Sequence, residues 1–109
     1  MVNAPSRDEV WLVRLDPSLG AEIKKTRPCL VVSPNEMNRA LRTVMVAPMT
    51  SVLRDYPTRV AVHFRGRDGQ VALDQIRAID RERMVRKLGT VPAKAAEEVS
   101  RILREMFER

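Results

Sequence analysis

The chain has few of the residues that build disulfides, metal cages and histidine-based sites. Among its 109 residues there is one cysteine, Cys29, and one histidine, His63. A single cysteine excludes an internal disulfide and a thiolate metal cage. A single histidine excludes an acid and base pair built from two imidazoles. Cys29 precedes the apolar run Leu30–Val32, which favours a small buried residue over a nucleophile.

Aromatic residues are also scarce, with one Trp, one Tyr and two Phe. Four rings are too few for a platform on which several bases stack, as in sheet-based RNA readers. Any RNA binding is therefore expected to depend on phosphate contacts.

Long apolar runs are absent as well, and the start Met1–Pro5 has no apolar core of signal-peptide length. These absences predict a cytoplasmic protein without a membrane segment. The length predicts one core, which we divide into a loose leader at residues 1–8 and a single domain at residues 9–109.

Charge of one sign is in excess, because 20 Lys and Arg face 14 Asp and Glu for a net charge of +6. An excess of this size favours polyanion partners, or it does no more than keep the protein soluble. The basic residues are spread along the chain, so a binding surface requires the fold to gather some of them.

The hydrophobic pattern predicts several short strands and one long helix. Runs rich in β-branched residues, bounded by Pro, Gly, Asp or Ser, predict strands. The predicted strands cover residues 9–15, 28–32, 43–47, 59–64, 70–73, 75–79 and 85–91, with Pro48 ending the third. Residues 35–41 can form one or two helical turns. From Pro92 onward, apolar residues recur at helical spacing, with Pro92 in the first helical position.

These elements predict a mainly β protein of the α+β class. Six or seven short strands and one terminal helix favour a small curled antiparallel sheet, either a compact barrel or an α+β domain, with a C-terminal amphipathic helix.

Three polar residues near the predicted strand ends have the chemistry to cleave a phosphodiester. Arg27 keeps its charge, and its fork of donors matches two phosphate oxygens, while Pro28 restricts it to extended geometry. Thr50 can donate a hydrogen bond to a phosphate oxygen, and Glu22 can accept a proton. From the residues alone, two alternatives stay open: Arg27 as a surface arginine paired with Glu22 or another acid, and Thr50 as a cap that bonds its own backbone.

The segments that carry these residues are Gly20–Pro28, with the pattern G-x-E-x-x-x-x-R-P, then Pro48–Ser51, and later Val71–Arg77. Together they resemble the MazF/PemK family of toxin endoribonucleases, from about Glu9 to the C-terminal helix. The resemblance implies an SH3-like barrel with appended helices. It also implies that Arg27 and Thr50 are the catalytic pair. Glu22 matches the family's acidic position and is the weaker of the three catalytic assignments.

The resemblance extends to RNA binding. The pair Asp74-Gln75 matches a family position beside the RNA groove, where Gln75 could read a base edge and Arg77 could hold a phosphate. Without the resemblance, these residues form only a hydrogen-bonded turn with an ion pair. The remaining predicted RNA contacts are in two loops: Lys24, Lys25, Ser51 and Arg54.

A toxin of this kind is expected to cut single-stranded RNA without a metal or cofactor, leaving a 2′,3′-cyclic phosphate and a 5′-hydroxyl. The resemblance further implies a homodimer and a cognate antitoxin with an acidic, partly disordered segment, which a charge of +6 would attract. Two alternatives are a non-catalytic toxin on the same barrel that poisons DNA gyrase, and a nucleic-acid-binding module without cleavage.

Overall fold

A computed structural model describes residues 4–109, so the first three residues of the predicted leader lie outside the described residues. The strands are β1 (Glu9–Arg14), β2 (Thr26–Val31), β3 (Thr43–Thr50), β4 (Arg59–Phe64), β5 (Arg67–Ala72), β6 (Arg77–Asp80) and β7 (Met84–Thr90). The helices are α1 (Asn35–Ala40) and α2 (Ala93–Phe107), and the short 3₁₀ turns are η1 (Leu73–Gln75) and η2 (Arg81–Arg83).

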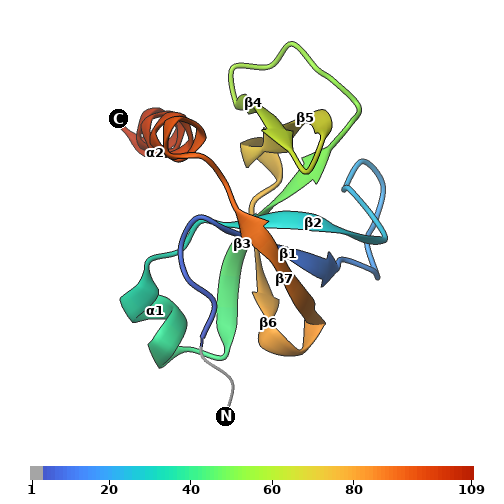
Figure 1. The fold of residues 1–109 in the computed structure, drawn as a ribbon, viewed down its shortest axis with the longest axis vertical. Helices are drawn as coiled ribbons and strands as arrows, with labels where there is room; N and C mark the ends of the chain where they lie inside the picture. The colour runs from blue at the N-terminus through green and yellow to red at the C-terminus, as the bar shows by residue number, and fades with distance from the viewer. Residues whose placement is uncertain (1–3) are drawn as a thin grey trace.

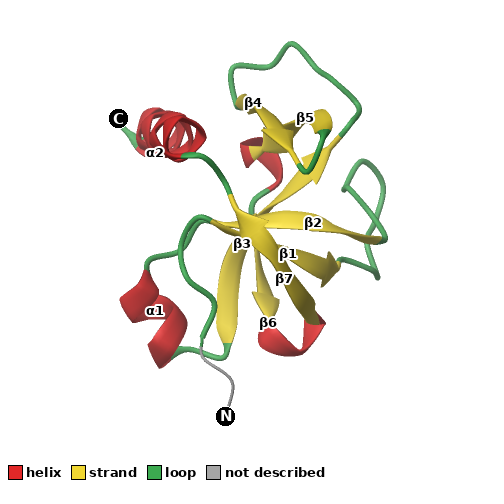
Figure 2. Ribbon diagram, in the orientation of Figure 1, coloured by secondary structure: helices red, strands yellow, loops and turns green. Residues whose placement is uncertain are grey.

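All strand pairs are antiparallel, in the order β4-β5-β3-β2-β1-β7, with β6 paired to β3. The sheet curls into an incomplete barrel, with α2 beside the β4–β5 hairpin and α1 toward the opposite end (Figures 1 and 2). The prediction of a mainly β, α+β domain with a C-terminal helix is confirmed.

Strand β3 is the centre of the sheet because it has three neighbours. One edge pairs with β2, and the other pairs with β6 along its first half and with β5 at Met49 and Thr50. The prediction that Pro48 ends this strand is wrong, since β3 continues to Thr50. Pro48 lies directly opposite Cys29, and a proline is tolerated where no partner needs its missing N–H.

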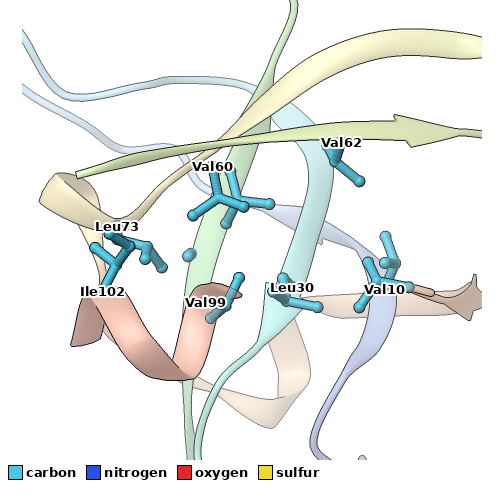
Figure 3. Packing of buried hydrophobic residues seen from close by; sticks show 10 residues of the cluster. Val10, Leu30, Val60, Val62, Leu73, Val99 and Ile102 are labelled. Carbon is cyan, nitrogen blue, oxygen red and sulfur yellow. The ribbon is translucent and has the colours of Figure 1, made fainter. Parts of the chain in front are cut away.

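Two apolar clusters form on opposite faces of β2 and β3, as alternation along a strand requires. On one face, Leu30 and Ala47 pack with residues of β4, β5 and α2. Figure 3 shows Val99 and Ile102 of α2 pointing at the sheet from below Val60. The other face has its own smaller cluster, made by Val13, Leu15, Cys29, Val31, Val44, Val46 and Ile79. Because both faces of β2 and β3 are buried, the middle of these strands is fixed, and their ends are where polar side chains can emerge.

Helix α2 confirms the predicted C-terminal amphipathic helix. It begins at Ala93, with Pro92 as the N-cap in place of the predicted first helical position. Neither helix in residues 4–109 has the length and apolar character that crossing a membrane requires.

The described part of the segment before β1 lies against the fold. The N–H of Asp8 donates to the carbonyl of Val31 at 2.9 Å, and the N–H of Val91 donates to the carbonyl of Asp8 at 3.1 Å. The side-chain amide of Asn38, which is fully buried, donates to the carbonyl of Pro5 at 3.0 Å. Asp8 thus extends the pairing of the first strand, and Asn38 holds Pro5.

Candidate nucleic-acid interface

Arg27 and Thr50 come from adjacent strands and leave the sheet on the same side. Cys29 and Pro48 are direct partners in the pairing of β2 with β3. Arg27 lies two residues before Cys29, and Thr50 lies two residues after Pro48, so each side chain has the orientation of its paired neighbour. Continuing the register by two residues places Arg27 opposite Thr50. The pairing of β2 with β3 ends at Cys29 and Pro48, and its extension puts the cation and the hydroxyl that the sequence singles out at adjoining strand ends.

The guanidinium of Arg27 is anchored at one nitrogen and available at the others. Its Nε donates to the carbonyl of Lys24 at 2.7 Å. Within residues 4–109 no carboxylate lies within ion-pair distance of it, so the alternative of a surface pair with Glu22 is not found. An arginine held at Nε keeps its two terminal nitrogens for a phosphate.

The hydroxyl of Thr50 closes a turn and retains a proton to donate. Its Oγ1 accepts from the N–H of Val52 at 3.0 Å, which is the capping bond that the sequence offered as an alternative. The side chain is nearly buried, so its orientation is fixed. A hydroxyl has one donor in addition to its acceptor sites, and the backbone bond leaves that donor unused.

The β1–β2 loop, residues 15–25, carries three more of the predicted site residues. Glu22, Lys24 and Lys25 are all exposed. The carboxylate of Glu22 accepts from the N–H of Leu19 at 2.6 Å, which closes a tight turn. The main chain of Lys25 has a positive φ of 70° and bonds back to Asp16 and Leu15 at the base of the loop.

A pocket of about 500 Å³ lies between this loop and η1, and it collects four of the predicted residues. It is lined by Ala21, Glu22, Ile23, Pro48, Asp74, Gln75, Ile76 and Arg77. Arg27 and Thr50 do not line it, although Pro48, the neighbour of Thr50 on the same face of β3, does. The pocket is thus adjacent to the catalytic pair predicted from the sequence.

Asp74 is held in an ion pair with Arg59. Nε of Arg59 donates to Oδ1 of Asp74 at 2.8 Å, and the hydroxyl of Thr58 donates to the same oxygen at 3.1 Å. Burial works to raise the pKa of Asp74, but the hydrogen bonds and the charge of Arg59 outweigh it, so the pKa lies below the usual aspartate range. This is the turn and ion pair that the residues alone allowed.

Gln75 and Arg77 hold the β1–β2 loop. Oε1 of Gln75 accepts from the N–H of Ile23 at 2.6 Å, and its Nε2 donates to the carbonyl of Ala21 at 3.3 Å. Nη1 of Arg77 donates to the carbonyl of Leu15 at 3.2 Å and approaches the hydroxyl of Ser18 at 3.4 Å. Both ends of the Gln75 amide are therefore occupied by protein.

The β3–β4 loop, residues 51–58, carries the two remaining predicted residues, Ser51 and Arg54, both exposed. Gln70 of β5 bonds to this loop through both ends of its amide. Its Oε1 accepts from the N–H of Arg54 at 3.0 Å, and its Nε2 donates to the carbonyl of Arg54 at 3.1 Å. Arg59 adds a second contact, with its guanidinium 5.0 Å from the centre of the Tyr56 ring.

Sequence reasoning missed Gln70 and Arg59 because their partners are far away along the chain. Gln70 is opposite Thr50 where β5 pairs with the end of β3, a neighbour that only the folded sheet reveals. Cys29 is fully buried as predicted, and burial raises the pKa of its thiol to about 12. No group of three or more His, Cys, Asp or Glu in residues 4–109 is arranged to hold a metal.

The fold and this surface define a small curled β domain with a cation, a hydroxyl and a basic loop at adjoining strand ends. Residues 6–107 match the family model described as the PemK-like, MazF-like toxin of type II toxin-antitoxin systems. The match covers nearly the whole chain, and the chain belongs to this family.

Its curated relatives include the endoribonuclease PemK of Escherichia coli, which is 39% identical over 99 residues covering 85% of this chain and 74% of PemK. The endoribonuclease MazF9 of Mycobacterium tuberculosis is 35% identical, covering 80% of this chain and 82% of MazF9. Among solved structures, MazF from Deinococcus radiodurans has a TM-score of 0.85 at 29% identity and covers 97% of this chain and 98% of its own. A mycobacterial endoribonuclease in complex with its cognate antitoxin has a TM-score of 0.79 at 26% identity, covering 94% and 93%.

Proposed function

We propose that this chain is the endoribonuclease toxin of a type II toxin–antitoxin pair. It cleaves single-stranded RNA at a phosphate held by Arg27 and Thr50. The observation that carries the proposal is the emergence of these two side chains from one face of β2 and β3, at positions that match the family motifs. The names of the relatives, all endoribonucleases, support the activity.

In this mechanism the 2′-hydroxyl of the RNA attacks the adjacent phosphorus. A bond forms between O2′ and phosphorus, the bond to O5′ breaks, and the products are a 2′,3′-cyclic phosphate and a 5′-hydroxyl. The terminal nitrogens of Arg27 hold the non-bridging oxygens as negative charge develops on them, and the hydroxyl of Thr50 donates to one of these oxygens. Glu22 accepts the 2′-hydroxyl proton, and O5′ takes up a proton from water as it leaves. The chain supplies these groups from its own side chains, without a metal.

The two loops beside the pair supply the RNA-binding surface. Lys24, Lys25, Ser51 and Arg54 are exposed and meet the backbone through charge and hydrogen bonds. Arg77, together with Asp74 and Gln75, borders the pocket next to this path.

The chain acts as a homodimer that an acidic, partly disordered antitoxin segment inhibits. An unpaired sheet edge supports dimerisation, because β4 is a terminal strand of the described sheet and residues of β4 and α2 line a groove of about 1100 Å³. The positive charge of the chain supports the antitoxin, as does the relative solved with its own antitoxin.

The test is RNA cleavage in EDTA with identification of the new ends. Purified protein is expected to cut a mixed-sequence RNA at a short motif and leave cyclic phosphate and 5′-hydroxyl ends. Arg27→Ala is expected to lose at least about a hundredfold in kcat, the scale of one oxyanion contact, with unchanged thermal unfolding. Binding without cleavage would favour a nucleic-acid-binding module. Growth arrest with intact cellular RNA would favour a non-catalytic toxin.

A further inference from the structure

The segment from Gln70 to Gln75 is a rigid link between the two loops that flank Arg27 and Thr50. Its middle residues, Val71, Ala72 and Leu73, are fully buried. Val71 and Leu73 belong to the cluster that α2 covers. A segment packed in this way does not move independently of the core. The backbone positions of Gln70 and Gln75, at the two ends of this segment, are therefore fixed.

Each glutamine holds one loop by the same arrangement. Gln75 accepts from the N–H of Ile23 and donates to the carbonyl of Ala21, both in the β1–β2 loop. Gln70 accepts from the N–H and donates to the carbonyl of Arg54, in the β3–β4 loop. A side-chain amide that satisfies a backbone donor and a backbone acceptor replaces the pairing that a loop lacks.

The loops held in this way carry the charged groups of the proposed site. The β1–β2 loop contains Glu22 and runs directly into Arg27, whose Nε bonds to the carbonyl of Lys24 in the same loop. The β3–β4 loop follows Thr50 directly and bonds to its hydroxyl through Val52. A shift of either loop thus moves a group on which the chemistry depends, and a displacement of about 1 Å at a catalytic group costs on the order of a hundredfold in rate.

We propose that Gln75 and Gln70 are positioning residues, a pair of amide clamps that set both loops around the scissile phosphate from one buried segment. This inference rests on the proposed function. It assigns to Gln75 a task other than reading a base, because its amide is already used by Ala21 and Ile23.

The test combines amide hydrogen exchange with steady-state cleavage for the full chain and Gln75→Met, an apolar side chain of similar length. Exchange at Ile23 is expected to rise about fivefold or more, since one neutral hydrogen bond supplies a factor of that size. Exchange at Leu15, whose N–H bonds to the carbonyl of Lys25, is expected to stay unchanged. We expect kcat to fall by about fivefold or more while KM changes by less than about twofold. Gln70→Met is expected to lower kcat in the same way and to speed amide exchange at Arg54 in place of Ile23.

Asn35→Leu is the matched control, because the amide of Asn35 also accepts one backbone N–H, that of Arg7 at 2.7 Å, but lies on α1. It is expected to speed exchange at Arg7 and leave kcat unchanged.

If Gln75→Met proves too unstable, Gln75→Glu retains an acceptor for Ile23 but cannot donate to Ala21. It should keep most of the protection at Ile23 and an intermediate kcat.

Unchanged exchange at Ile23, or faster exchange with normal kcat, would overturn the inference. A rise in KM with normal kcat, or a changed cleavage motif, would assign Gln75 to base contact and overturn it as well. If the wild type cuts no RNA while the variant speeds exchange at Ile23, the proposed function fails and the clamps remain as loop anchors only.

Discussion

At the residue scale, the proposed site depends on side chains that the fold leaves incompletely bonded. Arg27 uses Nε and Thr50 uses one acceptor site, and each keeps donors free. Asp74, Gln75 and Arg77, which the sequence also offered as RNA contacts, bond to other residues of the protein, and both ends of the Gln75 amide are used in this way. A resemblance to a family motif identifies the residue types but not which of their atoms are already used. That distinction needs the folded partners.

Asp74 gives a prediction of acid sensitivity. Its pKa is below the usual range in the folded state, so its ion pair stabilises the fold above the unfolded aspartate pKa. This stability is lost as the pH falls through the lower, folded value. Asp74→Asn is expected to reduce the free energy of unfolding by about 1 kcal/mol at pH 7, a value discounted for partial exposure, and to flatten its pH dependence below about pH 4.

The measurement is urea unfolding between pH 3 and pH 7. Asp68→Asn is the control, because Asp68 pairs with His63 in a fully solvated position where its side chain is 89% exposed. The explanation fails if both variants lose stability equally, or if the dependence of Asp74→Asn on pH matches that of the wild type.

At the element scale, the end of β3 is fixed by the close approach of β5. A Cβ added to Gly69 would lie 2.8 Å from the backbone oxygen of Thr50. Neither the added Cβ nor the Thr50 oxygen is at the end of a flexible side chain, so β3 and β5 must separate. Gly69→Ala is therefore expected to displace Thr50, to lower the free energy of unfolding by about 1 to 3 kcal/mol and to lower kcat at least about tenfold.

Gly66→Ala in the β4–β5 turn is the matched variant. Gly66 has a φ of +78° and nothing within 4 Å of an added Cβ, so the change strains the turn without moving Thr50. It is expected to cost roughly 1 to 2 kcal/mol of stability and to leave kcat intact. Equal loss of kcat in both variants would show that stability, and not the position of Thr50, controls the rate.

The elements themselves were largely predictable from local pattern. The alternation in β4, the apolar run in β2 and the helical spacing in α2 reproduce their observed positions within a few residues. The error at Pro48 arose because a proline reads as a strand end, whereas its tolerance depends on the partner strand. The clamps of Gln70 and Gln75 were not predictable, since they depend on which loops a curled sheet brings next to β5 and η1.

At the scale of the whole molecule, the net charge of +6 contributes to the proposed RNA binding only where the fold exposes basic side chains near the proposed site. Lys24, Lys25 and Arg54 lie exposed on the two flanking loops, whereas Arg59 is used internally by Asp74. Counting basic residues in the sequence therefore overestimates the phosphate contacts.

Salt dependence measures those contacts directly. Binding of a non-cleavable 2′-O-methyl oligonucleotide is expected to weaken linearly on a log–log plot against salt. Arg54→Ala is expected to reduce the slope by about 0.7, the contribution of one phosphate on a single strand. Arg104→Ala on α2 is the control and should leave the slope unchanged. An unchanged slope for Arg54→Ala would remove this residue from the RNA path.

The central claim is that Arg27 and Thr50 act on one phosphodiester, and a double-mutant cycle on single-turnover cleavage tests it most directly. The single variants are Arg27→Ala and Thr50→Val, and the double variant is measured under the same conditions. If both side chains stabilise the same transition state, each single change should remove most of the rate and the double variant should be much less impaired than the product of the two effects. Strictly multiplicative losses, or near-normal cleavage by either single variant, would contradict the claim.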